Sequence, residues 1–403
     1  MNIVKGSDNC SDWNNFKIKD VFLANEKSKV KASDSFSEGL FPFFNCSEKQ
    51  TKFSNDYLVD GENIFISTGG DFMYTLYHKG RASYSTDVWS VKVLHCDTKF
   101  IGYKLKSNFE QNQTHFRGFK FKHLNKNSFK ESSITVPSLY QQRQIVEILS
   151  KQESIINKTK ELINELDKRN TFMLDELLSG RLRIKEENGA ITFYKNPEDN
   201  WQSVIMNGEE KQIPKDWNID LLSNRISFGM GSTPKKESDN YNGDLPWVTI
   251  ANLKNKYLKS YTALIKRSIK NVKIIPKESL LGSFKMSVGR FSITTFDCAT
   301  NEAIISISKK DTSFDLDYLY YYLPKIFKEN ATLNAQGIPL LNTKSIKKIQ
   351  IIFSDKKNQE NIAKFLSSLD SEKEKYEELL IEEQKKFDFL LEELMSGRLR
   401  IEE

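Results

Sequence analysis

The chain has 403 residues, of which 38% are hydrophobic and 28% are charged. This balance excludes a chain that is disordered throughout, and the length suits two or three globular domains. The formal net charge is +6 and the pI is about 8.8, which is compatible with a polyanionic partner without establishing one.

No apolar segment approaches the roughly 18 residues that a membrane-spanning helix needs. The first residues, MNIVKGSDNCSDW, lack the apolar core of a secretory signal peptide, so we expect a cytoplasmic protein. The cysteines Cys10, Cys46, Cys96 and Cys298 lie far apart and form no CxxC pair. Neither a disulfide framework nor a metal site is therefore indicated.

Residues 1–137 are predicted to form a mixed, strand-rich domain, with strands at 63–68 and 88–94 and turns at Gly-Gly and Asp-Gly pairs. Its polar loops carry positive charge. Lysine and arginine suit contacts with DNA phosphates, and arginine also suits contacts with base edges. As single residues they are equally compatible with ordinary solvated loops. The candidate DNA-binding residues of this domain are Lys79, Arg81 and Arg117.

An amphipathic helix is predicted over residues 138–184. Pro137 ends an extended run, and Ser138 with Gln141 three residues later forms a capping-box pattern. Apolar residues then recur at helical spacing, while lysine and glutamate occupy the other faces. The predicted core positions of this helix are Ile145, Leu149, Ile156, Leu162 and Leu166.

Residues 185–212 are predicted to be a linker, and residues 213–354 a second mixed, strand-rich domain. Strands are expected at 246–253 and 291–296, and the loops again combine positive charge with polar side chains. The candidate DNA-binding residues of this domain are Thr233, Lys235, Lys236, Arg290 and Gln336.

A second amphipathic helix is predicted over residues 355–403, with Asp355 as its N-cap. Each helix of about 40 residues would be roughly 60 Å long, so each needs a long partner. The matching lengths and apolar stripes favour an antiparallel pair, and the alternative is that each helix packs only on its own domain. The predicted core positions of this helix are Ile362, Leu366, Leu369, Leu379 and Leu394.

The chain contains an internal repeat. Residues 134–184 align without a gap to residues 351–401, at an offset of 217 residues, with 21 identities in 51 positions. A weaker match at an offset of 204 residues aligns Asp12-Trp13 with Asp216-Trp217. The chain is therefore organised as A–B–A′–B′, where A is 1–137, B is 138–184, A′ is 213–354 and B′ is 355–403. The two helical B segments resemble each other far more than the two A domains do.

The six letters SGRLRI end both B segments. Gly180 and Gly397 stand where a helix favours a left-handed residue after its last turn, and arginines suit the negative end of the helix. Capping alone does not require the whole motif to recur, so we expect a docking surface that is presented twice. Its candidate residues are Ser179, Gly180, Arg181, Arg183, Ser396, Gly397, Arg398 and Arg400.

The sequence predicts no catalytic residues. The segment Asp244-Leu-Pro-Trp247 approaches the N/D-P-P-Y/F motif of adenine methyltransferases but lacks its second residue, proline. Phe228-Gly-Met-Gly231 does not fall cleanly between a strand and a helix, as a cofactor loop would. Walker A, GxSxG and HExxH motifs are absent from the sequence.

The order of motifs, and their occurrence in both halves, resembles the specificity (S) subunits of Type I restriction–modification systems. The resemblance rests on Ile213-Pro-Lys-Asp-Trp217, on Gly231-Ser-Thr-Pro234 followed by Gly243-Asp-Leu-Pro-Trp247, on Gln336-Gly337, and on the repeated helix end. It covers nearly the whole chain. The first half departs from the pattern because no Gly-Ser/Thr-Thr-Pro segment follows Trp13.

The resemblance implies an α+β fold with two target recognition domains, separated by two long antiparallel helices that form a coiled-coil spacer with pseudo-twofold symmetry. It implies double-stranded DNA, two methyltransferase (M) subunits and restriction (R) subunits as partners, and no membrane. S-adenosylmethionine and ATP with magnesium would bind those partners, so this chain would hold no cofactor. Two alternatives are a stand-alone DNA methyltransferase or nuclease, and a coiled-coil adaptor without a role on DNA.

Overall fold

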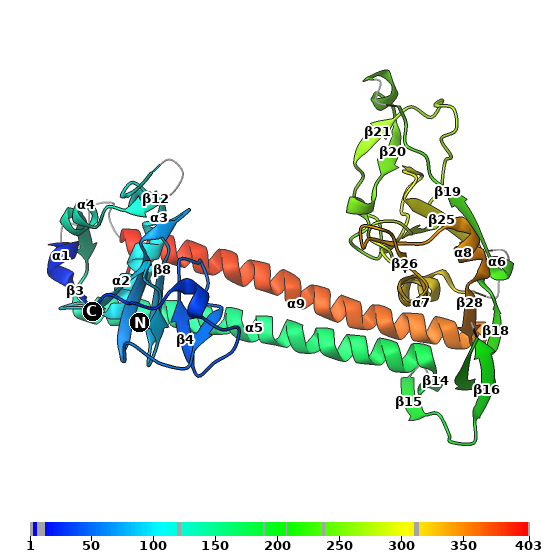
Figure 1. Cartoon of the computed structure of the whole chain (residues 1–403), viewed down its shortest axis with the longest axis horizontal. Helices are drawn as coiled ribbons and strands as arrows, with labels where there is room; N and C mark the ends of the chain where they lie inside the picture. The colour runs from blue at the N-terminus through cyan, green and yellow to red at the C-terminus, as the bar shows by residue number, and fades with distance from the viewer. Residues whose placement is uncertain are drawn as a thin grey trace. The chain divides into compact units, whose positions relative to one another are not determined.

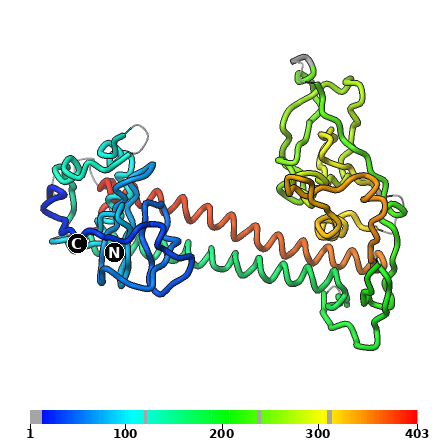
Figure 2. The backbone as a smooth tube through the Cα atoms, in the orientation of Figure 1, coloured from blue at the N-terminus to red at the C-terminus, as the bar shows by residue number. Residues whose placement is uncertain are grey.

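The computed structural model describes residues 3–5, 13–118, 122–187, 190–206, 208–235, 238–309 and 314–401. The chain forms two compact units, which the ribbon in Figure 1 and the trace in Figure 2 display. The first unit joins Met1–Leu162 with Tyr376–Glu403, and the second is the continuous stretch Ile163–Lys375. Both units mix helices with strands, as the predicted α+β class requires.

The first unit is built on a four-stranded antiparallel sheet with the order β3-β10-β6-β8. Helix α2 brings Phe100 and Ile101, both fully buried, into the core of this unit. Its elements are β1 (Ile3–Lys5), β2 (Asn14–Lys17), α1 (Ile18–Val21), β3 (Phe22–Ala24), η1 (Ala32–Asp34), β4 (Phe41–Phe44), β5 (Lys52–Ser54), β6 (Glu62–Ser67), β7 (Gly69–Gly70), β8 (Thr75–Lys79), β9 (Ser83–Tyr84), β10 (Val88–Val93), α2 (Thr98–Ser107), α3 (Phe109–Gln113), β11 (Phe116–Arg117), β12 (Lys122–Leu124), α4 (Lys126–Glu131), β13 (Ser133–Val136), the first part of α5 (Leu139–Ser179), the last part of α9 (Lys356–Ser396), and β29 (Leu399–Ile401).

The second unit has its own four-stranded antiparallel sheet, with the order β19-β25-β22-β23. Helix α7 supplies the fully buried Tyr318 and Phe327 to its core. Besides the remaining parts of α5 and α9, its elements are β14 (Leu182–Glu187), β15 (Ala190–Lys195), β16 (Trp201–Met206), β17 (Glu209–Pro214), β18 (Asn218–Leu221), α6 (Leu222–Arg225), β19 (Ile226–Met230), η2 (Ser238–Tyr241), β20 (Leu245–Val248), η3 (Ile250–Asn252), β21 (Ala263–Ile265), β22 (Leu280–Ser283), β23 (Phe291–Ile293), β24 (Ala299–Thr300), β25 (Ile304–Lys309), α7 (Leu316–Glu329), β26 (Thr332–Leu333), β27 (Pro339–Leu340), α8 (Thr343–Lys348) and β28 (Gln350–Phe353).

The sequence repeat is also a repeat of topology. The pair β2-β13 recurs as β18-β28, with Asn14 opposite Val136 in the first pair and Asn218 opposite Phe353 in the second. The sheet β5-β4-β9 recurs as β21-β20-β24, each with one antiparallel and one parallel neighbour of the central strand. The two A domains therefore share a strand arrangement although their sequences have diverged.

Of the four strands expected from the sequence, two have nearly the expected bounds and two are shorter. The strands expected at 63–68 and 88–94 correspond to β6 and β10. The strand expected at 246–253 stops at Val248, because the Asn252 side chain accepts a hydrogen bond from the Thr249 amide (2.9 Å) and starts a short helical turn. The strand expected at 291–296 stops at Ile293, and the Thr294 hydroxyl turns inward to the Pro276 carbonyl (2.9 Å).

The two long helices begin at the predicted caps. The Ser138 hydroxyl accepts a hydrogen bond from the Gln141 amide (3.3 Å), and the Asp355 carboxylate accepts one from the Asn358 amide (3.0 Å). Helices α5 and α9 each have 41 residues, which corresponds to roughly 60 Å.

Within each unit, half of α5 packs on half of α9. In the first unit the Gln152 amide donates to the Glu383 carbonyl (3.2 Å), and in the second the Asn170 amide donates to the Leu369 carbonyl (3.3 Å). The two helices are therefore antiparallel in both units, as predicted (Figure 2). The predicted core residues Ile145, Leu149, Ile156, Leu166, Ile362, Leu366, Leu369 and Leu394 are buried, whereas Leu162 and Leu379 are only half-buried.

Residues 185–212, predicted as a linker, contain regular structure. Two antiparallel hairpins, β14-β15 and β16-β17, occupy most of residues 185–212. Their strands are largely exposed, so the apolar alternation that normally reveals a strand is weak there. Each long helix is divided between the two compact units. None of the described helices is both long and apolar enough to cross a lipid bilayer.

Candidate nucleic-acid interface and repeated helix ends

The repeated motif SGRLRI ends each long helix with the same backbone geometry. Gly180 and Gly397 have φ angles of 74° and 76°, in the left-handed region that favours glycine. A Cβ atom on Gly180 would lie 2.5 Å from Cγ of Pro214, so this position also excludes any side chain for lack of space. The hydroxyls of Ser179 and Ser396 each donate to a carbonyl three residues earlier, at 3.1 Å in both copies.

The first arginine of each motif is paired to acidic residues of its own helix. Arg181 donates to Asp175 and Glu176, and Arg398 donates to Glu392 and Glu393, at distances between 2.6 and 2.8 Å. Both arginine side chains remain substantially exposed, so these pairs contribute little to stability. The charge of the first arginine therefore lies at the surface in both motifs, partly neutralised by its own helix.

The second arginine of the first motif, Arg183, is buried. Arg183 forms two parallel hydrogen bonds with the Asp216 carboxylate, at 2.9 and 2.6 Å, and lies over the Trp217 ring. These bonds from Arg183 lower the pKa of the Asp216 carboxyl. In the other copy Arg400 donates to the Gly397 carbonyl (3.2 Å), and Asp12, the equivalent of Asp216, lies outside the described residues. Arg183 therefore ties the end of α5 to the A′ domain, which makes it a structural residue as well as a docking candidate.

Each A domain is joined to the long helices by a glutamine. Gln142 in α5 donates to the Pro137 carbonyl (2.9 Å) and accepts from the Asp97 amide (2.8 Å). Gln359 in α9 does the same with Ser354 (2.9 Å) and Asp315 (3.1 Å). Asp97 and Asp315 are the N-caps of α2 and α7. One buried amide side chain thus fixes the helix of each A domain on a long helix.

A tyrosine and a carboxylate form the second part of the same connection. The Tyr103 hydroxyl of α2 donates to Glu153 of α5 (2.5 Å), and the Tyr321 hydroxyl of α7 donates to Asp370 of α9 (2.6 Å). Burial raises the pKa of both tyrosines, so both hydroxyls remain donors. We call each set of glutamine, tyrosine and carboxylate contacts a joint. The joints were not predicted as sites, although Gln142 and Gln359 are one identity of the repeat and could have suggested them.

The DNA-binding candidates of the first A domain are exposed but partly neutralised. Lys79 lies 3.1 Å from Glu62, and Arg81 lies 3.5 Å from Asp60 and stacks over the ring of Tyr57. Arg117 makes only a long hydrogen bond to the Thr114 carbonyl (3.4 Å).

In the A′ domain the candidates lie on separate loops. The Thr233 hydroxyl donates to Glu302, Lys235 is exposed beyond β19, and Gln336 is exposed in the turn between β26 and β27. Arg290 precedes β23 and lines a cleft. Lys236 lies outside the described residues. Among the described residues, no hydrogen bond or ion pair joins these candidates into one cluster.

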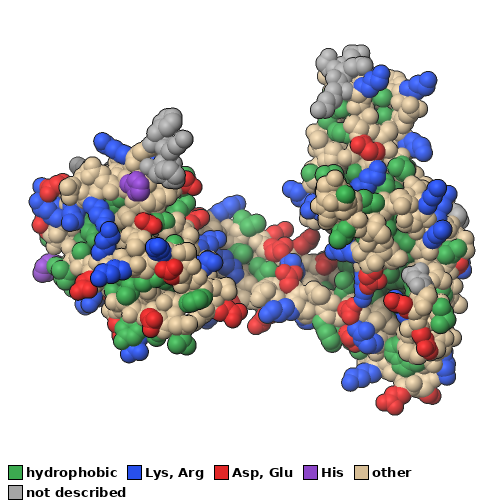
Figure 3. All heavy atoms as spheres, in the orientation of Figure 1, with side chains coloured by type: hydrophobic (Ala, Val, Ile, Leu, Met, Phe, Trp, Pro, Cys, Tyr) green, Lys and Arg blue, Asp and Glu red, His purple; other side chains and the backbone are tan. Residues whose placement is uncertain are grey.

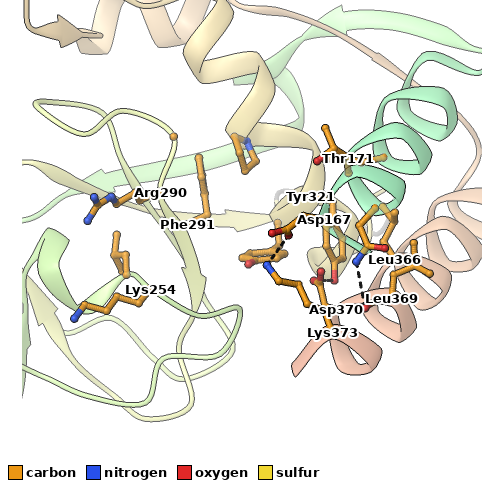
Figure 4. Close-up of a pocket in the computed structure, with 16 residues that line it drawn as sticks. Asp167, Thr171, Lys254, Arg290, Phe291, Tyr321, Leu366, Leu369, Asp370 and Lys373 are labelled. Atoms are coloured by element: carbon orange, nitrogen blue, oxygen red, sulfur yellow. Dashed lines mark hydrogen bonds and ion pairs between the residues drawn. The ribbon is translucent and has the colours of Figure 1, made fainter. Parts of the chain in front are cut away.

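The cleft beside Arg290 has a volume of about 670 Å³ and lies within the second unit. Figure 4 places Lys254 and Arg290 on one side, and Asp167, Asp370 and Lys373 of the long helices on the other. Lys373 is paired to Asp167 (2.6 Å). In contrast, neither Lys254 nor Arg290 has an ion-pair partner among the described residues. The A′ side of the cleft thus carries two uncompensated positive charges.

These two residues belong to a basic segment that the sequence analysis overlooked. Residues 253–290 contain ten lysines and arginines and one acidic residue, Glu278. Most of these cations are exposed, and blue side chains are spread over the visible face of the unit that carries β20 and β21 (Figure 3). A charge count in a sliding window would have revealed the segment, because the net charge of the whole chain hides it.

The described residues offer no arrangement for metal chemistry. Among them, no group of three or more histidine, cysteine, aspartate or glutamate side chains could hold a metal ion. Burial raises the pKa of the Cys298 thiol to about 12, which leaves it protonated at neutral pH and a poor nucleophile.

Two curated relatives are specificity subunits of Methanocaldococcus jannaschii. The MjaIX subunit is 27% identical over 204 residues, which cover 48% of this chain and 45% of the relative. The MjaVIII subunit is 24% identical over 424 residues, which cover 97% of this chain and 93% of the relative. The match thus spans about half of the first relative and nearly all of the second.

Two solved structures share the fold. The crystal structure of a Type I restriction-modification S subunit from M. genitalium has a TM-score of 0.60 at 16% identity, covering 95% of this chain and 96% of that chain. A chain from a study of complex assembly and conformational transition of the Type I R-M system has a TM-score of 0.58 at 16% identity, covering 99% and 100%.

A family model matches both halves of the chain, at residues 10–168 and 214–383. The matched residues include nearly all of both A domains and most of both long helices, and together they exceed half of the chain. The protein therefore belongs to the family of the Type I restriction modification DNA specificity domain.

Proposed function

We propose that the chain is the sequence-specific DNA-binding subunit of a Type I restriction–modification complex, and that each A domain recognises one half of a two-part DNA site. One observation carries this proposal: the same strand arrangement occurs twice, and each copy is attached to the long helices by the same joint. Two equivalent domains on one frame allow one protein to recognise two separated half-sites.

The distribution of charge supports DNA as the ligand. In the basic segment 253–290, exposed cations such as Lys259, Lys270 and Lys273 have no ion-pair partner among the described residues. Such cations bind phosphates and supply affinity that depends on salt, whereas polar side chains at loop tips distinguish bases. Gln336 and Arg290 are residue types that can contact base edges.

The two antiparallel helices would act as a coiled-coil spacer with pseudo-twofold symmetry, which sets the gap between the half-sites. Half-sites contacted from one face of DNA lie about 34 Å apart, a distance that helices of roughly 60 Å can span. The repeated helix ends would dock two methyltransferase subunits, and restriction subunits would join this core. The chain itself would not be an enzyme. S-adenosylmethionine would bind the methyltransferase subunits and ATP with magnesium the restriction subunits, and the modified adenine would be flipped out of the duplex by a methyltransferase subunit.

The test is methylation-sensitive sequencing of DNA from cells with and without this chain. We expect adenine methylation at one two-part motif with a fixed gap, present only when the chain is present. Exchange of residues 213–354 for those of a relative should change one half of the motif and leave the other half intact. Absence of such a motif would refute the proposal, and so would methylation or cleavage of DNA by the purified chain alone.

A further inference from the structure

Lys256 differs from the other cations of the basic segment in its position. Its side chain is only 12% exposed, whereas Lys254 and Lys259 on either side of it are exposed. Its ammonium lies 2.6 Å from the Asp317 carboxylate of α7 and donates to the Ser367 hydroxyl of α9 (2.6 Å). It therefore contacts both α7 and α9. These two helices meet at the joint of the A′ domain, which we call the second joint; the joint of α2 with α5 is the first.

Aromatic rings complete the surroundings of this ammonium. The rings of Tyr257, Tyr320 and Tyr321 lie between 5.1 and 5.9 Å from it, within the range of cation–π attraction. Tyr321 is the joint tyrosine that donates to Asp370. A cation with a carboxylate, a hydroxyl and three ring faces as neighbours is fully compensated inside the protein, so it is not available to a phosphate.

The cations near the first joint are arranged differently. One of them is Lys99, which lies 3.2 Å from Glu153 and over the Tyr103 ring. Lys99 belongs to α2, the same helix that carries Tyr103. Lys99 also lies over the ring of Tyr77 in β8, and Lys104 of the same helix donates to the Met395 carbonyl of α9. These cations belong to the helix of the joint itself, whereas Lys256 brings a separate element, the basic segment, to the second joint.

Residues next to Lys256 are also held by hydrogen bonds. The Lys256 carbonyl accepts from the Ile293 amide (2.7 Å), and the Asn255 carbonyl accepts from the Ser292 hydroxyl (2.6 Å). The Tyr257 hydroxyl donates to Asp317 (3.2 Å). The start of the basic segment is thus held on β23 and on α7 at the same place.

We propose that Lys256 is a positioning residue for recognition of the second half-site. It ties the start of the basic segment to α7 and α9, so that the exposed lysines on either side of it meet DNA at a fixed place. This inference rests on the proposed function. It assigns different roles to two lysines of one segment that the sequence alone cannot distinguish, since Lys256 positions the segment and Lys259 contacts phosphate.

The test compares Lys256→Met with Lys259→Met in the complex with methyltransferase subunits. The half-site of the A′ domain is first identified by the exchange of residues 213–354. Methylation rates are then measured on duplexes with the intact motif and with one mismatch in either half. Lys256→Met should lower discrimination about tenfold at the second half-site only, a loss within the discrimination that one base pair normally provides, because the basic segment is no longer held on α7 and α9. Lys259→Met should weaken binding to all sequences, reduce the salt slope by about one, and leave discrimination unchanged.

Two further measurements separate positioning from general destabilisation. The melting temperature of each variant is recorded, and Asp317→Asn removes the charge partner of Lys256 while it keeps the side-chain shape. Asp317→Asn should reproduce the selective loss, and it carries the test if Lys256→Met fails to fold. Unchanged discrimination in both variants would overturn the proposal, as would an equal loss at both half-sites accompanied by a lower melting temperature. A wild-type complex without a two-part motif would instead overturn the proposed function itself.

Discussion

Asp370 is a carboxylate held in a partly buried position. It accepts the Tyr321 hydroxyl in the cleft of the second unit. Burial raises the pKa of its carboxyl, although the hydrogen bond from Tyr321 and the charges of Lys256 and Lys373 act in the opposite direction. The folded chain therefore binds this proton more readily than the unfolded chain does, and the ionised carboxylate costs stability.

The first prediction concerns the pH dependence of this cost. As the pH falls through the raised folded pKa of Asp370 toward the unfolded value, near 3.8, the wild type should gain stability from this group. Asp370→Asn keeps an acceptor for Tyr321 but has no proton to bind. At neutral pH the substitution should change the unfolding free energy by less than about 1 kcal/mol. The free energy of unfolding of both proteins is measured by urea denaturation between about pH 4 and pH 7. The wild type should become more stable relative to Asp370→Asn as the pH falls. A difference that is constant across this range would contradict the prediction.

At the scale of elements, the long helices are defined by their ends more than by their length. Ser138 and Asp355 start them, and Gly180 and Gly397 stop them with nearly identical backbone angles. At the end of α5 the chain also packs tightly, because Pro214 lies against Gly180. The helix end and the A′ domain are therefore built as one piece.

The second prediction uses two glycines with the same φ of 74°. Gly180→Ala adds a methyl group against Pro214, whereas Gly337→Ala adds one with no atom within 4 Å. The backbone cost of a left-handed alanine, about 1–2 kcal/mol, is common to both. Gly180→Ala should therefore lower the unfolding free energy by about 3 kcal/mol or more, and Gly337→Ala by about 1 kcal/mol. If urea denaturation gave equal losses of unfolding free energy for both variants, the contact between the added methyl group and Pro214 would carry no energetic penalty, which would contradict the prediction.

The third prediction concerns docking at the repeated ends. Because Arg181 and Arg398 are exposed and paired only within their own helices, their joint replacement by alanine should leave the fold intact. Replacing both arginines with alanine should weaken assembly with methyltransferase subunits about tenfold, or ~1.4 kcal/mol, without changing the DNA motif. The control is the double variant Lys168→Ala and Lys385→Ala, which removes the same charge from equivalent exposed positions along the helices. Equal affinity of both double variants for the partner would leave the motif with a helix-ending role only.

At the scale of the whole molecule, the second unit is inserted into the first. Residues 163–375 form one compact unit between the two segments of the other. Helices α5 and α9 cross this division without interruption. The only connections between the units along the chain are thus two continuous helices of equal length.

The fourth prediction lengthens both helices equally. Four helix-forming residues are inserted after Leu162 in α5 and after Lys375 in α9, where the two units meet in the chain. Each helix grows by about 6 Å, close to two base-pair steps of about 3.4 Å. The methylated motif should keep both half-site sequences and gain one or two base pairs in its gap, as sequencing of methylated DNA would reveal. An insertion in α5 alone is the control, and it should disrupt the pairing and reduce methylation. A gap that stays the same after the double insertion would refute the idea that the helices set it.

The sequence predicted those features that depend on local rules. Helix caps, helix ends and the apolar stripe are decided within a few residues, so Ser138, Gly180 and Leu149 could be placed correctly. The hairpins in 185–212 were missed because their exposed strands carry no clear alternation. The joints and the tie at Lys256 were missed because they join distant residues, Lys256 and Ser367 being 111 positions apart. Such pairings depend on tertiary packing, which one sequence does not encode in any local pattern.

The insertion of one unit into the other has a consequence for synthesis on the ribosome. Phe387, Leu391 and Leu394 belong to the core of the first unit, yet they are translated after the whole second unit. At about 5–20 residues per second, the more than 200 intervening residues take on the order of ten to forty seconds. During that interval the core surface of the first domain has no partner, whereas the second unit emerges as one continuous stretch. The nascent chain should therefore complete its second half first, and its first half should be the one that depends on chaperones.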